Sequence, residues 1–316
     1  MKAVALYSGG LDSSLVIKLV REWGVQVFPL HVSHQFLALD DLPQVEGLKI
    51  IDASEELIEV VRNPQYGYGK NLNPCIDCRI LMLKKAKEYM EVLKADFIIT
   101  GEVLDQRPMS QRLDTLMLID KKVGLEGLVV RPLSGGILPL TIPEKKGLID
   151  RNKLLKIKGR TRKPGLELAK KMKIAKFFSP SGGCLLTDPG FSKRMADLMR
   201  FQEEISIKDI ELLKLGRHFR FSPETKFVVG RNKQENDRIE KLINPSDTFF
   251  YVADTGSPNA VLIGNKKYLK IAAAITARYS DKKSDPQVGV DYKSTKETNK
   301  ILVKPIEENE LAKLRI

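Results

Sequence analysis

The hexapeptide Ser8-Gly9-Gly10-Leu11-Asp12-Ser13 decides the fold of the N-terminal part of this 316-residue chain. It follows the apolar run Ala3–Tyr7 and leads into a helical pattern of apolar residues, Leu15–Val20. A buried strand, a glycine turn and a helix N-terminus in that order form an anion site, because glycines let the backbone approach a phosphate and free N–H groups point at it. Ser8 and Ser13 add hydroxyl donors, and Asp12 can hold a magnesium ion or cap the helix. An ordinary Gly-Asp turn would also give strand, turn and helix.

Strand-like runs alternate with helical stretches after this motif. We expect strands at 25–32, 48–52 and 97–101, and helices at 55–62 and 81–93. This alternation predicts an α/β fold, a doubly wound parallel sheet with helices on both faces. Ligands bind at the carboxyl ends of such strands, where Ser8, His31 and Gly101 would lie. His31 can therefore contact the edge of a nucleotide or be a structural histidine.

The pattern changes near residue 205, where short strands (219–221, 227–229, 248–252 and 260–263) accompany two helices (235–243 and 268–279). It predicts a smaller α+β domain. We therefore expect two domains, 1–204 and 205–316.

Positive charge dominates the chain. The net charge is +13 and the isoelectric point is near 9.5, which favours a polyanionic partner. Residues 144–176 carry 13 Lys or Arg against three acids. At the centre of this segment we expect a loop between two helices. Its cations are candidates for contact with the phosphate backbone of a nucleic acid, although a solvent-exposed basic face would have the same sequence. The candidates are Lys156, Lys158, Arg160, Arg162 and Lys163.

The sequence has no apolar stretch long enough to cross a bilayer and no signal peptide. We expect a cytoplasmic protein with no membrane partner.

The three cysteines lie in two places. Cys75 and Cys78 form C-x-x-C after Asn73-Pro74, and Cys184 follows Ser181-Gly182-Gly183. A disulfide is disfavoured in a reducing cytosol, and a tetrahedral zinc site would need a fourth ligand. Three thiolates fit a 4Fe–4S cluster with one open iron. They also fit persulfide chemistry, with Cys184 carrying sulfur and either of the other two resolving it. Buried inert cysteines are the third alternative.

The motif S-G-G-L-D-S resembles the PP-loop of the N-type ATP pyrophosphatases, which split ATP between its α and β phosphates. Together with Asn73-Pro74-Cys75-x-x-Cys78 and the stretch 99–111, it resembles the ATP-dependent tRNA thiolation enzymes. The segments 131–134, 138–144 and 159–163 resemble the short form of 4-thiouridine synthetase. The resemblance covers about residues 1–200. The longer 4-thiouridine synthetases begin with an RNA-binding THUMP domain, whereas this chain begins with the PP-loop strand.

The resemblance implies ATP, Mg²⁺ and a 4Fe–4S cluster as cofactors. Residues 7–13, His31 and Gly101 would bind the nucleotide, and Cys75, Cys78 and Cys184 would hold the cluster. The expected nucleotide-loop residues are Tyr7, Ser8, Gly9, Gly10, Leu11, Asp12 and Ser13.

The resemblance also implies roles for individual residues. Asp12 would organise metal and phosphate, and Cys184 would act in sulfur transfer. Asp105 is a candidate proton acceptor, and Lys84 a candidate contact of the adenylate phosphate. Side chains expected to border the reacting uridine are Gln106, Arg107, Ser110 and Gln111.

The C-terminal module resembles the RNA-binding domain of the NFACT family. Its segment 228–237 resembles that family's G-R-N-x-x-E-N-D motif, which makes Arg231 and Asn232 candidate RNA contacts. Tyr251 stands where the family often has histidine. A packing domain without an RNA role is the alternative.

The sequence thus predicts an ATP-dependent tRNA sulfurtransferase, with 4-thiouridine favoured over 2-thiouridine or persulfide-based thiolation at another position. The expected partners are tRNA and a sulfur donor, either hydrosulfide or a persulfide from a cysteine desulfurase, with a homodimer as one possible assembly. Lysidine formation would not need the three cysteines, and amidation would need a separate Cys-His pair. A non-catalytic RNA-binding or ribosome-associated factor is the alternative outside the enzymes.

Overall fold

The computed structural model describes residues 1–37, 42–174, 176–177, 183–294 and 297–316. Ala175 of the basic segment, and Ser181 and Gly182 beside the third cysteine, lie outside the described residues. The chain divides into two compact units, Met1–Asp188 and Pro189–Ile316. This division lies before helix α7 (Pro189–Phe201), whereas the sequence placed it at 204/205. Helix α7 belongs with the second unit because it packs against α8 (Ile207–Leu213), and its Asp197 pairs with Arg220.

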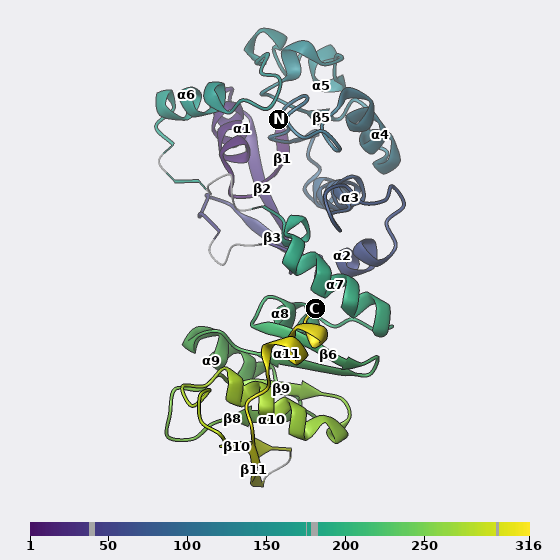
Figure 1. Cartoon of the computed structure of the whole chain (residues 1–316). Coiled ribbons are helices and arrows are strands. Elements are labelled where there is room, and N and C mark those ends of the chain that lie inside the picture. The colour runs from purple at the N-terminus through teal and green to yellow at the C-terminus, as the bar shows by residue number, and fades with distance from the viewer. Residues whose placement is uncertain (38–41, 175, 178–182, 295–296) are drawn as a thin grey trace. The chain divides into compact units, whose positions relative to one another are not determined.

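The first unit is a five-stranded parallel sheet in the order β3-β2-β1-β4-β5. Figure 1 shows α1 and α6 on one face of this sheet and α3 on the other, which confirms the predicted α/β fold. The elements are β1 (Lys2–Leu6), α1 (Leu11–Glu22), β2 (Gln26–Ser33), β3 (Lys49–Asp52), α2 (Ser54–Arg62), α3 (Cys75–Leu93), β4 (Phe97–Ile99), α4 (Leu113–Val123), β5 (Val129–Val130), α5 (Ile142–Lys145) and α6 (Lys163–Lys171).

Strand β1 is buried on both faces, as the central strand of a parallel sheet must be. Its alternate residues Ala3, Ala5 and Tyr7 pack in one cluster with Ile17 and Val20 of α1. In the register, Leu6 pairs with Leu30 of β2, and Ala5 pairs with Ile99 of β4. The carboxyl ends of β2, β1 and β4 are therefore neighbours, and the loops that follow them meet at one edge of the sheet.

Helix α3 begins six residues earlier than the sequence indicated. The C-x-x-C pair precedes the expected helix 81–93 in sequence, but in the structure it forms the first turn of α3, after Pro74 at the N-cap. Cys75 and Cys78 therefore lie three residues apart on one face of a helix N-terminus.

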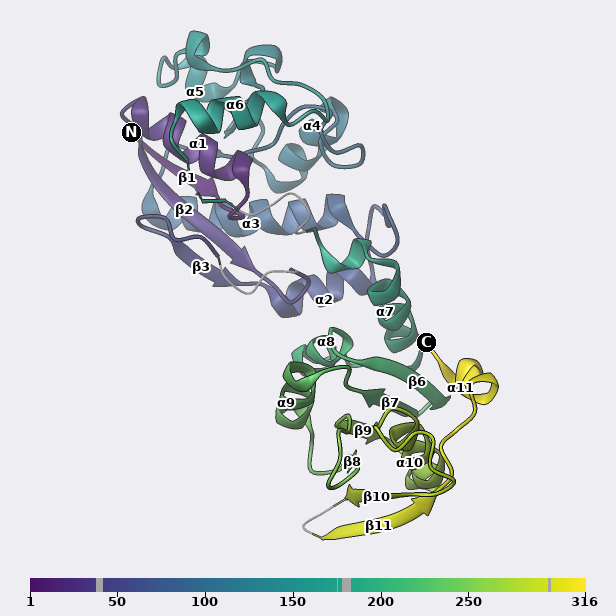
Figure 2. The same cartoon turned by 60° about the vertical axis from the view of Figure 1, so that its left-hand side comes forward.

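The second unit is a six-stranded antiparallel sheet in the order β11-β10-β8-β9-β7-β6. Helix α10 packs on one face over Phe219, Phe227 and Phe250, while α8 and α9 cover Val228 and Val261 on the other (Figure 2). The expected α+β domain is therefore present. Its further elements are β6 (Arg217–Ser222), β7 (Thr225–Val229), α9 (Lys233–Leu242), β8 (Thr248–Tyr251), β9 (Ala260–Ile263), α10 (Leu269–Arg278), β10 (Val288–Lys293), β11 (Thr298–Val303) and α11 (Glu308–Leu314).

None of the helices in the described ranges combines the length and the apolar character that a bilayer span requires.

Candidate functional site

The loop Ser8–Ser13 joins β1 to α1 in the first unit. Gly9 has a φ of 72°, a left-handed conformation that favours glycine. The Ser13 hydroxyl donates to the Gly10 carbonyl oxygen at 2.9 Å and accepts from the Ser8 amide at 3.3 Å. These bonds hold the turn closed, and α1 begins directly at Leu11. The loop therefore has the strand-turn-helix geometry that presents backbone N–H groups to an anion.

Tyr7 and His31 lie at the ends of β1 and β2 beside this loop. Nδ1 of His31 donates to the Tyr7 carbonyl oxygen at 2.9 Å, and the Tyr7 hydroxyl donates to the Pro43 carbonyl oxygen at 3.0 Å. Burial lowers the pKa of His31, which keeps the imidazole neutral near pH 7. A neutral ring in this position can accept a hydrogen bond from a ligand, and it brings no charge to the site.

Gly101 follows β4 and lies against the backbone of the loop. A Cβ atom at this position would come within 2.6 Å of the Asp12 carbonyl carbon and 2.7 Å of the Ser13 amide nitrogen. Glycine is therefore required here so that the end of β4 can pack against the first turn of α1.

Asp12 is the carboxylate of the loop. The side-chain amide of Gln106 donates to its Oδ2 at 3.2 Å. Burial raises the pKa of Asp12, while this hydrogen bond and the charges of Arg162 and Arg107 act in the opposite direction. The carboxylate thus lies among cations of two separate segments, as expected where a polyphosphate and its metal would bind.

A buried ion network stands behind Gly101. Arg131 donates two bonds to Asp120, each 2.8 Å, and one to Glu102 at 2.9 Å. Arg131 and Glu102 are almost fully buried, at 3% and 1% exposure. Arg79, one residue after Cys78, pairs with the other oxygen of Glu102 at 3.4 Å. Burial opposes ionisation of Glu102, but the charges of Arg131 and Arg79 lower its pKa below the usual value.

The network connects the strand end at Gly101 to the cysteine helix. Sequence reasoning missed it, although Arg131 was part of a quoted motif. The signal was an arginine in an otherwise apolar run, 129–133.

Cys184 is brought to Cys75 and Cys78 by backbone pairing. The Leu185 amide donates to the Phe36 carbonyl oxygen at 2.9 Å, and the Leu72 amide to the Leu186 carbonyl oxygen at 3.2 Å. The three thiols are close enough for the charge of one to act on another: Cys184 and Cys75 both act on Cys78.

The environment of the thiols is buried and partly cationic. Burial raises the pKa of Cys78 to about 12 and that of Cys184 to about 11, and it also raises the pKa of Cys75. The charge of Arg107 acts on both Cys75 and Cys184, as it does on Asp12. The same arginine thus adds positive charge to the surroundings of the nucleotide loop and of two of the cysteines.

The side chains at the two places are of the types that bind the expected metals. Three thiols gathered in one place suit iron–sulfur ligation, and one carboxylate beside a phosphate site suits Mg²⁺, which needs only one or two protein carboxylates. As the side chains stand, the described residues contain no group of three or more His, Cys, Asp or Glu arranged to hold a metal ion. Cluster binding would therefore require the thiols to lose their protons and close in.

The other expected site residues differ in their surroundings. Asp105 pairs with Lys158 at 3.3 Å and has a φ of 60°. Lys84 is exposed on α3, about 13 Å along the helix from Cys75, and makes no hydrogen bond or ion pair with any described residue. Ser110 and Gln111 are buried, at 2% exposure each. Of the residues expected to border a uridine, Gln106 and Arg107 are therefore the accessible ones.

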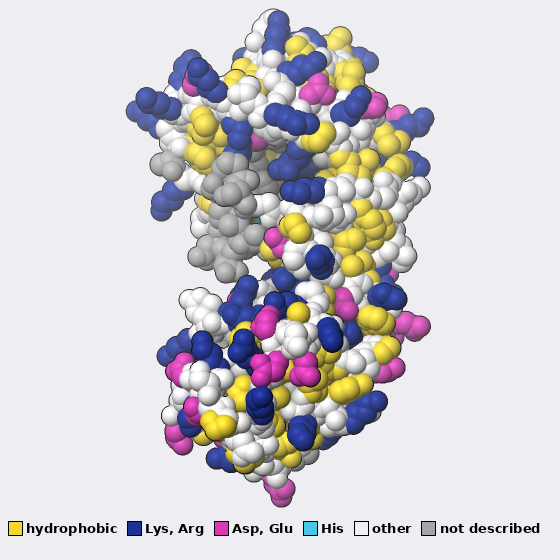
Figure 3. Space-filling view, viewed as in Figure 1, with side chains coloured by type: hydrophobic (Ala, Val, Ile, Leu, Met, Phe, Trp, Pro, Cys, Tyr) yellow, Lys and Arg dark blue, Asp and Glu magenta, His cyan; other side chains and the backbone are white. Residues whose placement is uncertain are grey.

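The basic segment approaches the loop. The backbones of Lys158 and Leu104 form an isolated parallel β-bridge, in which the Gly159 amide donates to the Leu104 carbonyl oxygen at 2.7 Å. Helix α6 then packs on α1, with Gly165 near the Asp12 carboxylate. Figure 3 shows Lys and Arg side chains gathered over α6. Lys156, Arg160 and Lys163 thus lie on a basic surface beside the candidate nucleotide site.

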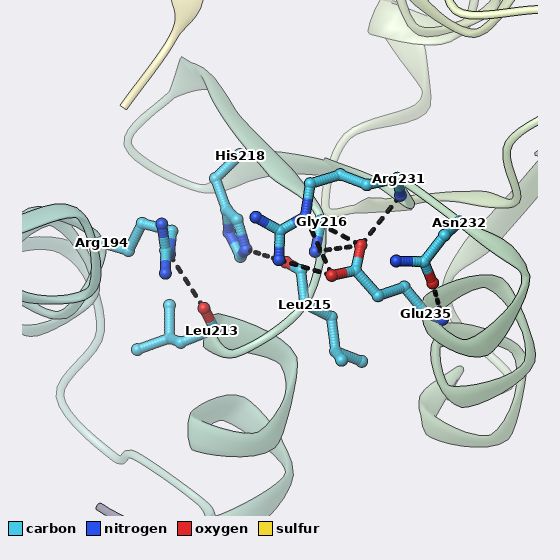
Figure 4. Close-up of polar contacts among 8 residues, drawn as sticks. All are labelled: Arg194, Leu213, Leu215, Gly216, His218, Arg231, Asn232 and Glu235. Atoms are coloured by element: carbon cyan, nitrogen blue, oxygen red, sulfur yellow. Dashed lines mark hydrogen bonds and ion pairs between the residues drawn. The ribbon is translucent and has the colours of Figure 1, made fainter. Parts of the chain in front are cut away.

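Arg231 and Asn232 belong to the second unit, where local contacts occupy them. Asn232 caps α9, because its side-chain oxygen accepts from the Glu235 amide at 3.0 Å. The Arg231 guanidinium donates to the Glu235 carboxylate at 2.9 Å. Part of the G-R-N-x-x-E-N-D pattern therefore forms a helix cap and an ion pair within the unit (Figure 4).

Two family models match separate parts of the chain. Residues 1–136 match the thiamine biosynthesis protein family, ThiI, and residues 216–315 match the NFACT protein RNA binding domain. The chain carries a ThiI-type domain and an NFACT-type RNA-binding domain. This confirms both resemblances that the motifs indicated.

Individual relatives agree with the first match. A probable tRNA sulfurtransferase of Thermococcus kodakarensis is 28% identical over 144 residues, which is 42% of this chain and 37% of that protein. One from Methanocaldococcus jannaschii is 29% identical over 148 residues, again 42% and 37%. The chain thus matches less than two fifths of the length of these relatives.

Solved structures match weakly. A crystal structure of a 4-thiouridine synthetase with RNA and ATP has a TM-score of 0.37 at 19% identity, over 67% of this chain and 52% of that one. The C-terminal part of a fibronectin/fibrinogen-binding protein from Streptococcus suis has a TM-score of 0.30 at 15% identity, over 55% and 83%. The sheet topology and the family models carry the assignment instead.

Proposed function

We propose that this protein is an ATP-dependent tRNA sulfurtransferase that converts a uridine to 4-thiouridine. The observation that best supports the proposal is the connection between the two places: Gly101 lies against Asp12 and Ser13 of the loop, and the next residue, Glu102, pairs with Arg79, one residue after Cys78. An activating site and a sulfur-delivering site that are this close can act on one base. The relatives named as tRNA sulfurtransferases and the RNA-binding domain support the reaction class and the partner.

The first chemical step would occur at the loop. The uridine O4 attacks the α-phosphorus of ATP, the bond to the β-phosphate breaks, and N3 loses its proton. The backbone amides of Ser8–Ser13 would stabilise the departing pyrophosphate, and Asp12 would hold Mg²⁺ on the phosphates. Gln106 orients the Asp12 carboxylate, and Arg107 and Arg162 would balance the added negative charge.

The second step replaces oxygen by sulfur. Hydrosulfide adds to C4, AMP leaves, and the proton of the hydrosulfide ends on N3, so the exchange is redox-neutral. A cluster held by Cys75, Cys78 and Cys184 would supply an open iron position for the sulfur. Persulfide chemistry on Cys184 is the alternative route, and counts of iron and sulfide in the purified protein distinguish the two.

The test is a thiolation assay with the whole chain. Protein purified anaerobically, with its iron and sulfide counted, is incubated with ATP, Mg²⁺, sulfide and an unmodified tRNA transcript. We expect visible iron–sulfur absorbance, pyrophosphate release that requires tRNA, and 4-thiouridine in the digested nucleosides by mass spectrometry. Mass spectra of standards separate 4-thiouridine from 2-thiouridine.

Asp12→Asn should lower turnover by about three orders of magnitude with unchanged thermal unfolding, because it removes metal organisation and no packing. Asp114→Asn, at an exposed carboxylate on α4, is the matched control. Near-normal turnover of Asp12→Asn would show that the loop assignment is wrong.

A further inference from the structure

The sheet of the second unit has one face that its helices cover only in part. Phe250, Val290 and Val303 point into the cluster under α10, so the residues next to them in β8, β10 and β11 point to the other face. Helices α8 and α9 pack on that other face, and the cluster that they form with β7 and β9 contains no described residue of β8, β10 or β11. Figure 2 shows β10 and β11 at the end of the sheet away from α8. The uncovered part, which we call the outer sheet face, consists of the side chains of Phe249, Tyr251, Asp291, Lys293, Lys300 and Leu302.

Strand β8 contributes two aromatic rings to the outer sheet face. Phe249 and Tyr251 are two residues apart, and their ring centroids lie 5.8 Å from each other. Both residues are half-buried, and neither belongs to the hydrophobic clusters that the described residues of this unit form. Leu302 of β11, 61% exposed, adds apolar surface on the same face. The two rings are therefore available to a flat ligand that stacks on aromatic side chains.

A lysine stands beside these rings. The strand register places Lys293 of β10 opposite Phe249, and the Lys293 Nζ lies 5.6 Å from the centre of the Tyr251 ring. Lys293 is exposed and forms no ion pair with any described Asp or Glu. The outer sheet face thus offers a positive charge that a phosphate can neutralise, next to a surface that a base can cover.

Asp291 supplies a hydrogen-bond acceptor that has no donor. The register places it opposite Tyr251 on one side and opposite Lys300 on the other. Asp291 is 7% exposed, and its Oδ2 has no hydrogen-bond partner among the described residues. A buried carboxylate oxygen without a donor is costly, so a donor is expected from a ligand. The Lys300 Nζ lies 3.6 Å from Oδ1, on a side chain that is 63% exposed and therefore able to move aside.

We propose that the outer sheet face binds one unpaired base of an RNA strand. The base stacks on Phe249 and Tyr251, an N–H group on its edge donates to Asp291, and the neighbouring phosphate contacts Lys293. A base within a duplex cannot bind in this way, because its faces are stacked on its neighbours and its edge is paired. The inference rests on the proposed function, in which RNA is the partner, and it assigns the surface of the second unit that contacts RNA.

The test measures binding of a fluorescein-labelled single-stranded RNA of about eight nucleotides to the full chain, by fluorescence anisotropy. Tyr251→Leu and Phe249→Leu keep an apolar side chain and remove a ring, so each should weaken binding about tenfold. Tyr251→Phe is the matched control, because it keeps the ring and should bind as the wild type does. The same RNA annealed to its complement should bind more weakly than the single strand.

Salt dependence tests the phosphate contact. Lys293→Gln should reduce the slope of log affinity against log salt concentration by about 0.7, the value for one phosphate of a single strand. Lys270→Gln, at an exposed lysine of α10 on the opposite side of the sheet, should leave the slope unchanged.

A fluorescence signal reports stacking directly. The wild-type chain has a single tryptophan, Trp23, in the first unit, so it serves as the blank for Tyr251→Trp. Added single-stranded RNA should quench the tryptophan introduced at this position, and it should leave the emission of the wild type unchanged.

Wild-type affinity in Tyr251→Leu, or an equal loss in Tyr251→Phe, would overturn the stacking proposal and leave RNA as the partner. Unchanged emission of the Tyr251→Trp protein on saturation with RNA would overturn it as well. A wild-type chain that binds neither the single strand nor tRNA would overturn the proposed function together with this inference.

Discussion

Replacing Gly101 by alanine tests whether the strand ends and the loop form one site. The added Cβ would lie 2.6 Å from the Asp12 carbonyl carbon, 2.7 Å from the Ser13 amide nitrogen and 2.8 Å from the Asp12 carbonyl oxygen. All three are backbone atoms, which cannot rotate away as a flexible side chain can. The first turn of α1 or the end of β4 must therefore move.

The size of this movement follows from the distances. Ordinary contact begins at 3.4 Å, so the loop must withdraw by about 0.8 Å from the 2.6 Å position. Overpacking of this kind costs about 1–3 kcal/mol of stability. A displacement approaching 1 Å in positioning groups lowers the reaction rate by roughly 100-fold. We expect Gly101→Ala to lose about two orders of magnitude in turnover and to weaken ATP binding, while the first unit remains folded.

The assay measures ATP affinity by calorimetry, tRNA-dependent pyrophosphate release, and thermal unfolding by circular dichroism. Gly165→Ala is the matched control in α6, because its Cβ would meet Leu11 and Asp12 only at 3.5 and 3.6 Å. It should leave turnover unchanged and keep or raise stability by up to about 1 kcal/mol, since alanine favours helix. If Gly101→Ala keeps wild-type ATP affinity and turnover, the close approach has no functional role and the reasoning is wrong.

Three further predictions concern the other parts of the molecule. Alanine at any one of the three cysteines should abolish both cluster absorbance and thiolation. Double variants should lose no more activity than single variants, because removal of one ligand already removes the whole cluster. A Cys184→Ala protein that keeps four irons would indicate the persulfide route. Replacing the three cations of the segment 160–163 (Arg160, Arg162 and Lys163) by glutamine should leave ATP binding intact. It should reduce the slope of log affinity for tRNA against log salt concentration by about two to three. An unchanged slope would mean that these side chains contact solvent and not tRNA. Burial lowers the pKa of Lys226 from 10.5 to about 7. Between these pH values the unfolded chain binds more protons than the folded chain. The free energy of unfolding should therefore rise from pH 7 to pH 9, by up to about 1.4 kcal/mol per pH unit. Lys226→Met should flatten this rise in urea denaturation, whereas Lys241→Met should not, and equal pH dependence in all three proteins would contradict the burial argument.

Local patterns were enough to predict much of this protein. The strand, glycine turn and helix around Ser8–Ser13 were correct because they depend on residues next to one another. Alternation of apolar runs predicted the parallel sheet, and hence that Ser8, His31 and Gly101 share one edge. The change of pattern near residue 205 identified a second domain, although α7 joined that domain through contacts such as Arg220 with Asp197.

Tertiary structure decided the contacts that give these motifs their chemistry. Gln106 reaches Asp12 across 94 positions of sequence, and Arg131 reaches Glu102 across 29. One pocket of the second unit is lined by Arg217, Lys283 and Arg315, which belong to three separate segments of the chain. No periodicity predicts such pairs, because each depends on how whole elements pack. The type of each side chain is local, but its pKa and its partners depend on burial and on charges that only the folded chain brings together.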